Sequence, residues 1–292
     1  MRLGMIGLGR MGGSMAERLR SGGHEVIGHD PGVESDANSL PELVDALRVD
    51  DSPVVVWSMV PSGAVTQAVI DELTPLLVEG DVVVDGGNAD FTDSVQRASD
   101  IAAAGIGFVD AGVSGGVWGL ENGYALMVGG TDDAVAKVAP ALETLAPSQG
   151  FRHIGPAGAG HFTKMVHNGI EYGMMQSIAE GYELLAASEL DIDIPGALES
   201  WQEGSVVRSW LLDLLVRAEH EDPALVSIAG LASDSGEGRW TIREAVRLGV
   251  PVPAISAAIF ARFTSQQADS VAMKVVAALR DQFGGHGTVP HE

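Results

Sequence analysis

The segment RLGMIGLGRMG, residues 2–12, constrains the fold of this chain more than any other part of its sequence. An apolar run leads directly into GLGRMG, which matches the pattern G-x-G-x-x-G, and a helical pattern follows it. The order of strand, glycine turn and helix is typical of a dinucleotide-binding βαβ unit. In such a unit Gly7 permits the tight turn, Gly9 lets the backbone approach a pyrophosphate and Gly12 lets the helix pack close to the sheet. The helix N-terminus offers free N–H groups to the phosphates. The alternative is that the glycines serve only a turn.

Asp30 ends the second strand pattern, HEVIGHD (24–30). A carboxylate at this place can accept hydrogen bonds from both hydroxyls of an adenosine ribose, and it would repel a 2′-phosphate. The next residues, PGVES, contain no Arg or Lys that could neutralise such a phosphate. The sequence therefore predicts NAD rather than NADP as the cofactor. The alternative is that Asp30 only forms a turn before Pro31.

Further short apolar runs follow, separated in the first part of the chain by helical patterns; they are 53–59, 81–87, 107–113 and 124–130. Continuous apolar runs are typical of buried parallel strands, and their alternation with helices predicts an α/β fold with a Rossmann-type doubly wound sheet. After residues 151–160 the patterns are helical only: 161–190, 195–218, 222–233, 240–248 and 253–282. We therefore predict a dinucleotide-binding domain over residues 1–157 and an all-helical domain over 158–292, with the Gly-rich tail as an arm.

Composition excludes several classes of protein. The formal net charge of −23, from 40 acidic and 17 basic residues, would repel a phosphate backbone, so nucleic acid is not expected as a partner. There is no cysteine, and hence no disulfide or thiolate metal site. No apolar run reaches the roughly 18 residues of a membrane span, and the N-terminus has a strand pattern rather than that of a signal peptide, so we expect the cytoplasm as the compartment. The sequence leaves open whether the acidity reflects a saline habitat or composition bias.

The stretch GAGHFTKMVHNGIEY, residues 158–172, places polar groups at helical spacing. The stripe comprises Lys164, His167, Asn168, Glu171 and Tyr172. The other side is apolar or glycine, which predicts a helix buried nearly all round, with its stripe in a cleft facing the cofactor domain. The alternative is an ordinary surface face. Lys164 and Glu171 stand two turns apart, about 10 Å, so they can address different atoms of one small substrate. A desolvated lysine can act as a base, and a glutamate beside apolar groups can act as an acid.

With these residues assembled, the sequence resembles the decarboxylating 6-phosphogluconate dehydrogenases. The segments that carry the resemblance are GAGHFTKMVHNGIEYGMMQ, DAGVSGGVWG, GGNADF, GEGRWTIREAVRLGVPVP, FARFTSQ and RDQFGGH. They extend over nearly the whole chain. The long members of that family have a much larger helical domain with an internal duplication, and this sequence resembles the short form. Arg239 stands where the long form usually has lysine.

The resemblance implies roles by position. Lys164 would be the general base for the C3 hydroxyl, and Glu171 the acid that protonates the enediol. The carboxylate and hydroxyls of the sugar acid would be held by Asn88, Ser114, Gly115, Gly116, His167 and Asn168. The 6-phosphate would be held by Tyr172, Arg239, Arg262, Arg280 and His286. The residues expected at the cofactor are Gly7, Leu8, Gly9, Arg10, Met11, Gly12, Asp30, Met59, Val60 and Asn88.

The activity that the resemblance implies is oxidative decarboxylation of 6-phosphogluconate to ribulose 5-phosphate and CO2 with reduction of NAD and without a metal, as in the pentose phosphate pathway. It also implies a homodimer or homotetramer in which the C-terminal arm completes the active site of a neighbouring subunit. Two other functions stay open at this point. One is a β-hydroxyacid dehydrogenase of the 3-hydroxyisobutyrate type, and the other is a non-catalytic NAD-binding sensor.

Overall fold

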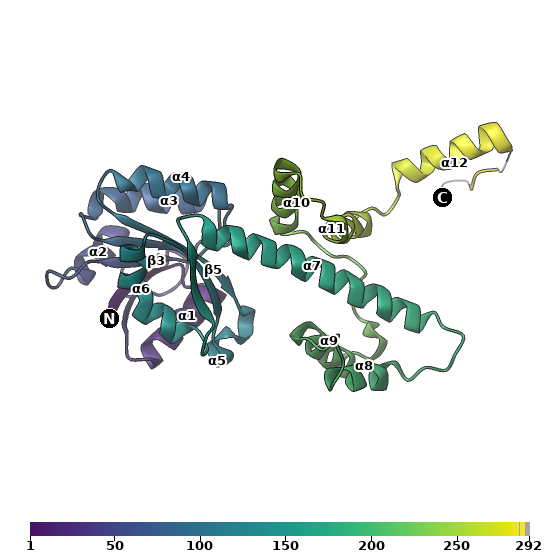
Figure 1. Ribbon diagram of the computed structural model, residues 1–292, viewed down its shortest axis with the longest axis horizontal. Coiled ribbons are helices and arrows are strands. Elements are labelled where there is room, and N and C mark those ends of the chain that lie inside the picture. Colours follow the sequence, from purple (N-terminus) through teal and green to yellow (C-terminus); the bar gives the residue numbers. More distant parts are fainter. Residues whose placement is uncertain (286, 290–292) are drawn as a thin grey trace. The chain divides into compact units, whose positions relative to one another are not determined.

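The computed structural model describes residues 1–285 and 287–289, and the chain divides into two units, Met1–His167 and Asn168–Glu292. The long helix α7, Ala159–Ala186, runs through both (Figure 1). The boundary that the sequence predicts after residue 157 stays a prediction of domain organisation. Among the described residues no helix is long and apolar enough to cross a membrane.

The first unit is built on one sheet with the strand order β2-β1-β3-β4-β5-β6-β7. Its strands are β1 Arg2–Ile6, β2 Glu25–His29, β3 Val55–Ser58, β4 Val82–Asp85, β5 Gly107–Ser114, β6 Ala125–Gly130 and β7 Phe151–Gly155. The strands β1 to β5 are parallel. The strand order reverses direction from β1, toward β2 on one side and β3 on the other, which is the arrangement of a doubly wound sheet.

The far edge of the sheet differs from the sequence prediction. β6 pairs with β5 antiparallel, and β7 then pairs with β6 in parallel. Only residues 115–124 connect β5 to β6, and a parallel crossover usually needs a dozen residues or more. β7 was not predicted because its middle residues, 152–154, are exposed and it contains no buried apolar run.

Helices cover both faces of this sheet (Figure 1). One face packs against α1, Arg10–Ser21, and α6, Asp132–Leu145, in a core that includes the fully buried Trp57. The other face packs against α2, Leu40–Leu47, α3, Ala64–Leu73, and α4, Phe91–Ala102. The predicted Rossmann-type fold is therefore confirmed. The short elements of this unit are η1 Thr74–Leu76, η2 Gly116–Trp118 and α5 Gly119–Asn122.

The described part of the second unit contains helices and no strand. Beyond α7 its elements are α8 Ile194–Gln202, α9 Trp210–Glu221, η3 Pro223–Leu225, α10 Glu237–Leu248, α11 Pro253–Ser265 and α12 Val271–Gly284. Two predicted helices are divided, because Ser209 and Ser270 cap new helix N-termini inside them. The predicted helix 222–233 is wrong, since only η3 forms there.

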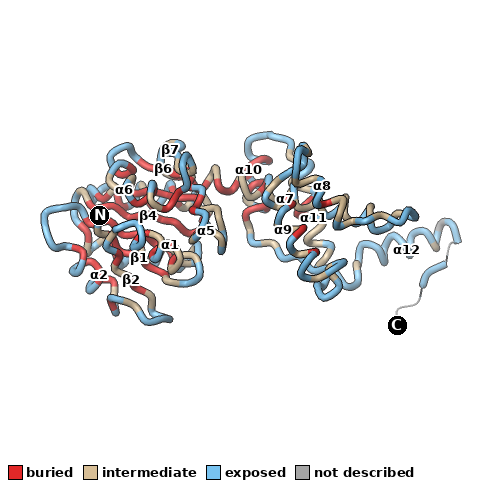
Figure 2. The backbone as a smooth tube through the Cα atoms, turned by 90° about the horizontal axis from the view of Figure 1, so that it is seen from below, coloured by how far each residue is buried: buried red, intermediate tan, exposed pale blue. Residues whose placement is uncertain are grey.

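Burial differs between the two units, and Figure 2 shows the buried residues gathered on the strands of the first. In the second unit the described side chains of α12 are almost all exposed, including the large apolar side chains of Val271, Met273, Val275, Val276 and Leu279. On α7 the side chain of Ile170 is 52% exposed and that of Met174 is 41% exposed. Met165 and Gly169 on the same side are buried. The prediction that α7 is buried nearly all round is therefore wrong, because part of its apolar side is exposed among the described residues.

Candidate active site

The glycine turn between β1 and α1 has the geometry that a dinucleotide requires. Gly7 has a φ of +86°, and a Cβ there would lie 2.9 Å from the carbonyl oxygen of Met59. A Cβ at Gly12 would overlap the carbonyl oxygen of Gly7, so the first turn of α1 packs directly on the turn. A Cβ at Gly9, by contrast, would meet nothing within 4 Å, which leaves open space over the N-terminus of α1. This cradle fits a pyrophosphate, whose charge the free N–H groups of α1 would stabilise.

Asp30 follows β2 directly and faces the same turn. Its carboxylate accepts hydrogen bonds from the backbone N–H of Gly32 and from that of Leu8, both at 2.7 Å. These two hydrogen bonds, of which the one from Gly32 has the larger effect, hold the pKa of Asp30 below its usual value. Each carboxylate oxygen still has a lone pair. The structure thus presents a fixed anion with acceptor capacity beside the glycine turn, where an adenosine ribose would lie.

The other predicted cofactor residues lie at the same edge of the sheet, since the carboxyl ends of parallel strands meet there. Arg10 and Met11 are in the first turn of α1, Met59 and Val60 follow β3, and Asn88 follows β4. The N–H of Met59 donates to the carbonyl of Ile6 at 2.7 Å, which ties the end of β3 to that of β1.

Lys164 is placed by a close approach of α7 to β5. A Cβ at Gly112 would lie 2.5 Å from the Cβ of Lys164, and a Cβ at Gly160 would lie 2.6 Å from the carbonyl oxygen of Met127. Only glycine at these two positions allows the helix to lie so near the strands. The lysine is 8% exposed, so it does not point into bulk water.

Asp110, on β5, fixes the start of α7. This fully buried carboxylate accepts hydrogen bonds from the backbone N–H of Gly158 at 2.7 Å and from that of His161 at 2.8 Å. It satisfies donors that a helix N-terminus leaves unpaired, and its negative charge is favoured there. Sequence reasoning missed Asp110, although a carboxylate inside an apolar run was a signal for a buried partner.

A second buried group supports the turn after β4. Arg97 of α4 pairs with Asp85 at 3.0 Å, and the carboxylate of Asp85 also accepts from the N–H of Gly87 at 3.2 Å. Burial raises the pKa of Asp85, while His161 and Arg97 act against that rise. His161 itself is held by Ser94, whose hydroxyl lies 2.7 Å from its Nδ1. Sequence reasoning also missed this group, of which Asp85 lies three residues before Asn88 in the sequence.

The loop after β5 carries Ser114, Gly115 and Gly116. The structure brings the hydroxyl of Ser114 to 3.5 Å from Nε2 of His167 on α7. Gly115 has a φ of 146° and Gly116 a φ of 53°, backbone conformations that favour glycine, so this loop needs both residues for its shape. Two of the predicted substrate ligands are therefore neighbours within the first unit.

The second unit gathers another predicted group around Tyr172, which is buried. The guanidinium of Arg262 stacks on the Tyr172 ring with 3.4 Å from its Cζ to the ring centroid. The phenol oxygen accepts from the N–H of Ser235 at 3.2 Å. Arg239 pairs with the buried carboxylate of Asp234 and lies over the ring of Phe263. Two arginines thus converge on the loop 233–236, a charge arrangement that suits a phosphate.

The remaining predicted residues are less defined. Asn168 contacts α10, as described below, and Glu171 is half-buried on α7. Arg280 lies on the exposed helix α12, so its role in a neighbouring subunit stays a prediction. His286 lies outside the described residues.

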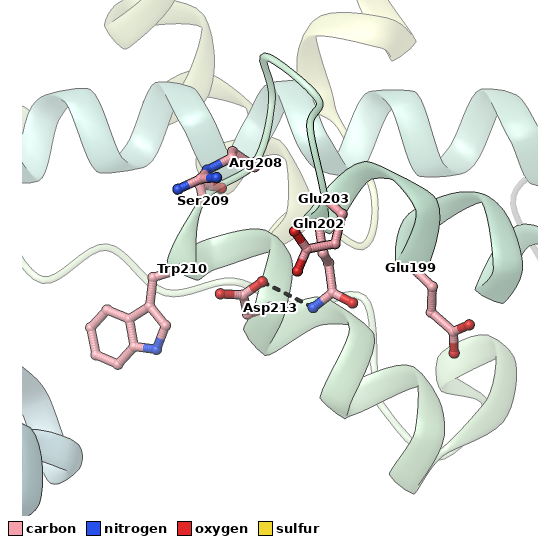
Figure 3. A pocket seen from close by; sticks show the side chains of 7 residues that line it. All are labelled: Glu199, Gln202, Glu203, Arg208, Ser209, Trp210 and Asp213. Carbon is pink, nitrogen blue, oxygen red and sulfur yellow. Dashed lines mark hydrogen bonds between the residues drawn. The ribbon is translucent and has the colours of Figure 1, made fainter.

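A separate cavity of about 700 Å³ opens between α8 and α9 (Figure 3). It is lined by Glu199, Gln202, Glu203, Arg208, Ser209, Trp210 and Asp213. Gln202 donates to Asp213 at 2.9 Å. Three carboxylates against one guanidinium make this lining unsuitable for an anionic sugar acid.

Comparison with known proteins identifies the family to which both parts of the chain are similar. The profile of the NAD binding domain of 6-phosphogluconate dehydrogenase matches residues 2–155, and that of the C-terminal domain of 6-phosphogluconate dehydrogenase matches residues 160–277. The chain belongs to the 6-phosphogluconate dehydrogenase family. It is therefore an oxidoreductase with a Rossmann-type NAD-binding domain and a helical C-terminal domain.

Two relatives match this chain over nearly their whole length. The putative 6-phosphogluconate dehydrogenase YqeC of Bacillus subtilis is 40% identical over 99% of both chains. The NAD(+)-dependent, decarboxylating 6-phosphogluconate dehydrogenase of Haloferax volcanii is 40% identical over 98% of both. Among solved structures, a Plasmodium falciparum 6-phosphogluconate dehydrogenase, studied without ligand, with NADP+ and with 6-phosphogluconate, has a TM-score of 0.79 and 26% identity. That match covers 100% of this chain and 67% of the other.

Proposed function

We propose that this protein catalyses the NAD-dependent oxidative decarboxylation of 6-phosphogluconate to ribulose 5-phosphate and CO2. The observation that carries the proposal is the arrangement along α7. Lys164 is buried against β5 through the glycine contact at Gly112, and Tyr172, two turns on, holds Arg262 on its ring. α7 thus offers an amine for proton transfer and the Tyr172 ring on which the guanidinium of Arg262, from α11, stacks as a cationic group for a phosphate. Within this proposal residues 1–157 bind the nucleotide and residues 158–292 form the substrate domain.

Lys164 acts at the C3 hydroxyl of the substrate. The bound nicotinamide supplies a hydride acceptor, and the turn at Gly7–Gly12 together with Arg10, Met11, Met59 and Val60 would hold it. As the hydride leaves C3, the neutral amine of Lys164 accepts the hydroxyl proton. The resulting ammonium then donates to the C3 carbonyl oxygen. When the C1–C2 bond breaks, its electrons move into the carbonyl, and the nearby positive charge stabilises the developing oxyanion. No metal is needed for this step.

Glu171 completes the reaction as an acid. The carbon that has lost CO2 is part of an enediol. It gains a proton while the hydroxyl on the neighbouring carbon returns its proton to Lys164, which gives the ketone product. Glu171 stands about 10 Å from Lys164 along the helix, so it can serve this carbon while the lysine serves the oxygen. Meanwhile Asn88, Ser114, Gly115, Gly116, His167 and Asn168 hold the carboxylate and hydroxyls. The phosphate is held by Tyr172, Arg239 and Arg262, with Arg280 and His286 from a neighbouring subunit.

Asp30 supports NAD as the cofactor. Its carboxylate is fixed by two backbone N–H groups beside the glycine turn, and a 2′-phosphate brought there would face that negative charge. The relative from Haloferax volcanii is named as NAD(+)-dependent. The Plasmodium falciparum structure contains NADP+, but its sequence identity to this chain is lower.

Exposed apolar surface in the second unit supports a homodimer or homotetramer. α12 exposes most of its apolar side chains, and Ile170 and Met174 on α7 are exposed as well. Exposed apolar surface is typical of association sites. We propose that a second copy covers these helices, and sedimentation velocity of the purified protein tests this.

One assay tests the proposed activity. The purified chain is incubated with 6-phosphogluconate and either nicotinamide, and the absorbance of the reduced nucleotide is followed together with CO2. We expect one CO2 for each nucleotide reduced, with NAD preferred. Reduction without CO2, or turnover of 3-hydroxyisobutyrate instead, would support the 3-hydroxyisobutyrate type. Nucleotide binding without any turnover would support the sensor.

A further inference from the structure

Glu237, the first residue of α10, is a buried carboxylate beside the substrate ligands. It is 5% exposed, and its Oε1 accepts a hydrogen bond of 3.2 Å from the Nδ2 of Asn168 on α7. A carboxylate in the first turn of a helix is favoured by the helix dipole. Its sequence segment, GEGRW, did not single it out, because a glutamate at a helix start is normally only a capping residue.

The backbone around this contact is held rigidly. A Cβ at Gly169 would lie 2.9 Å from a side-chain atom of Thr241, and a Cβ at Gly238 would lie 2.8 Å from the Tyr172 ring. The hydroxyl of Thr241 donates to the carbonyl of Glu237 at 2.8 Å. α7 and α10 therefore touch through two glycines, and the distance between Asn168 and Glu237 has little freedom to change.

Chemistry then decides which way the amide of Asn168 is turned. An ionised carboxylate accepts hydrogen bonds and donates none, so the amide must offer its NH2 group to Glu237. A buried carboxylate without such a donor would be costly. With Nδ2 directed at Glu237, the side chain has Oδ1, an acceptor, on its other side.

We propose that Glu237 is a positioning residue that makes Asn168 an acceptor for a hydroxyl group of the substrate. This role rests on the proposed function, and it adds that in the hydrogen bond between Asn168 and the substrate the hydroxyl donates and the amide oxygen accepts. The substrate has a carboxylate, which can only accept, and hydroxyls, which can donate. An acceptor at Asn168 therefore selects a hydroxyl of the substrate. The negative charge of Glu237 repels the carboxylate and the phosphate of the substrate from the neighbourhood of Asn168. The phosphate is left to the Tyr172 and Arg262 group, one turn or about 6 Å farther along.

A swap of donor and acceptor tests this assignment. Asn168→Asp places two carboxylates against each other, so we expect kcat/KM to fall by about 100-fold. Adding Glu237→Gln restores a donor–acceptor pair in reverse, because the introduced amide donates to the introduced carboxylate, which keeps an oxygen for the substrate. The double variant should regain about 10-fold or more in kcat/KM over Asn168→Asp alone. Glu237→Gln alone should retain most of kcat, whereas Glu237→Ala should mainly raise KM.

The control is Glu180→Gln on α7, where Gln176 donates to Glu180 at 2.9 Å in an exposed amide–carboxylate pair. It should leave kcat and KM unchanged. If the double variant folds but stays as inactive as Asn168→Asp, the amide donates to the substrate and the proposal is overturned. An Asn168→Asp variant with wild-type kinetics would overturn it equally.

Thermal unfolding of the wild type, Asn168→Asp, Glu237→Gln and the double variant gives a readout without substrate. Asn168→Asp should lower Tm, and Glu237→Gln should restore it; additive Tm changes would show that the two side chains are not paired. A wild-type protein that does not turn over 6-phosphogluconate would refute the proposed function, and the unfolding data would still decide whether Glu237 orients Asn168.

Discussion

Replacing Arg97 with methionine should destabilise the first unit far more than loss of an ordinary ion pair. The guanidinium and the Asp85 carboxylate are 2% and 1% exposed, and they lie 3.0 Å apart. Arg97→Met keeps much of the apolar volume and leaves the Asp85 carboxylate buried without its cation. Removing one partner of a buried pair costs about 3–5 kcal/mol. For a unit of this size that corresponds to a Tm lower by roughly 6–20 °C.

Circular dichroism during heating and in urea measures this loss. The matched control is Arg20→Met, because Arg20 and Asp36 pair at 2.7 Å in the same unit with 47% and 53% exposed side chains. An exposed pair contributes about 0–1 kcal/mol. The double variant Asp85→Asn with Arg97→Met removes both charges and should recover most of the stability. If Arg97→Met costs no more than Arg20→Met, the argument from burial is refuted.

The pH dependence of Arg97→Met gives an independent check. Burial already raises the pKa of Asp85, and Arg97 opposes that rise, so without Arg97 the pKa rises further. In the folded variant the protonated form of Asp85 is then favoured. The ionised Asp85, which has lost its cation, destabilises the fold only at a pH above the pKa of Asp85 in the folded variant. As the pH falls, Asp85 gains its proton and the stability gap to wild type narrows. A gap that widens toward acid would contradict this account.

Four further outcomes are expected. Lys164→Met should abolish turnover while nucleotide binding and circular dichroism stay normal, and Glu171→Gln should lower kcat more mildly; near-normal kcat in both would refute their assigned roles. Asp30→Ala, combined with a nearby arginine, should shift the kcat/KM ratio toward NADP, which fails if the wild type already prefers NADP. Truncation after Leu279 should raise KM for 6-phosphogluconate sharply, and unchanged kinetics would show that the C-terminal segment does not reach a substrate site. Gly112→Ala should push α7 off β5 and lower kcat with little change in nucleotide affinity, measured by fluorescence titration; a normal kcat would show that the close contact does not place the lysine.

Local sequence patterns were sufficient to predict the glycine turn and the carboxylate beside it. The turn Gly7–Gly12 and the carboxylate after β2 are defined by residues within one strand–turn–helix segment, and the structure gives them the predicted conformation. The stripe on α7 was also readable, because helical spacing alone puts Lys164 and Glu171 on one side. The apolar side of α7 was misjudged, since a spacing pattern shows that a face is apolar but not which segment covers it.

The sequence by itself determined the fold class, the glycine turn and the helix that bears the proposed catalytic pair, because each depends on neighbours a few residues apart. Only the tertiary structure decided which polar groups support them. Asp110 meets His161, Arg97 meets Asp85 and Glu237 meets Asn168 because β5, α4 and α10 pack beside partners far away in sequence. Such contacts depend on helix and strand packing, which brings buried charges to specific donors, and no local spacing encodes that choice.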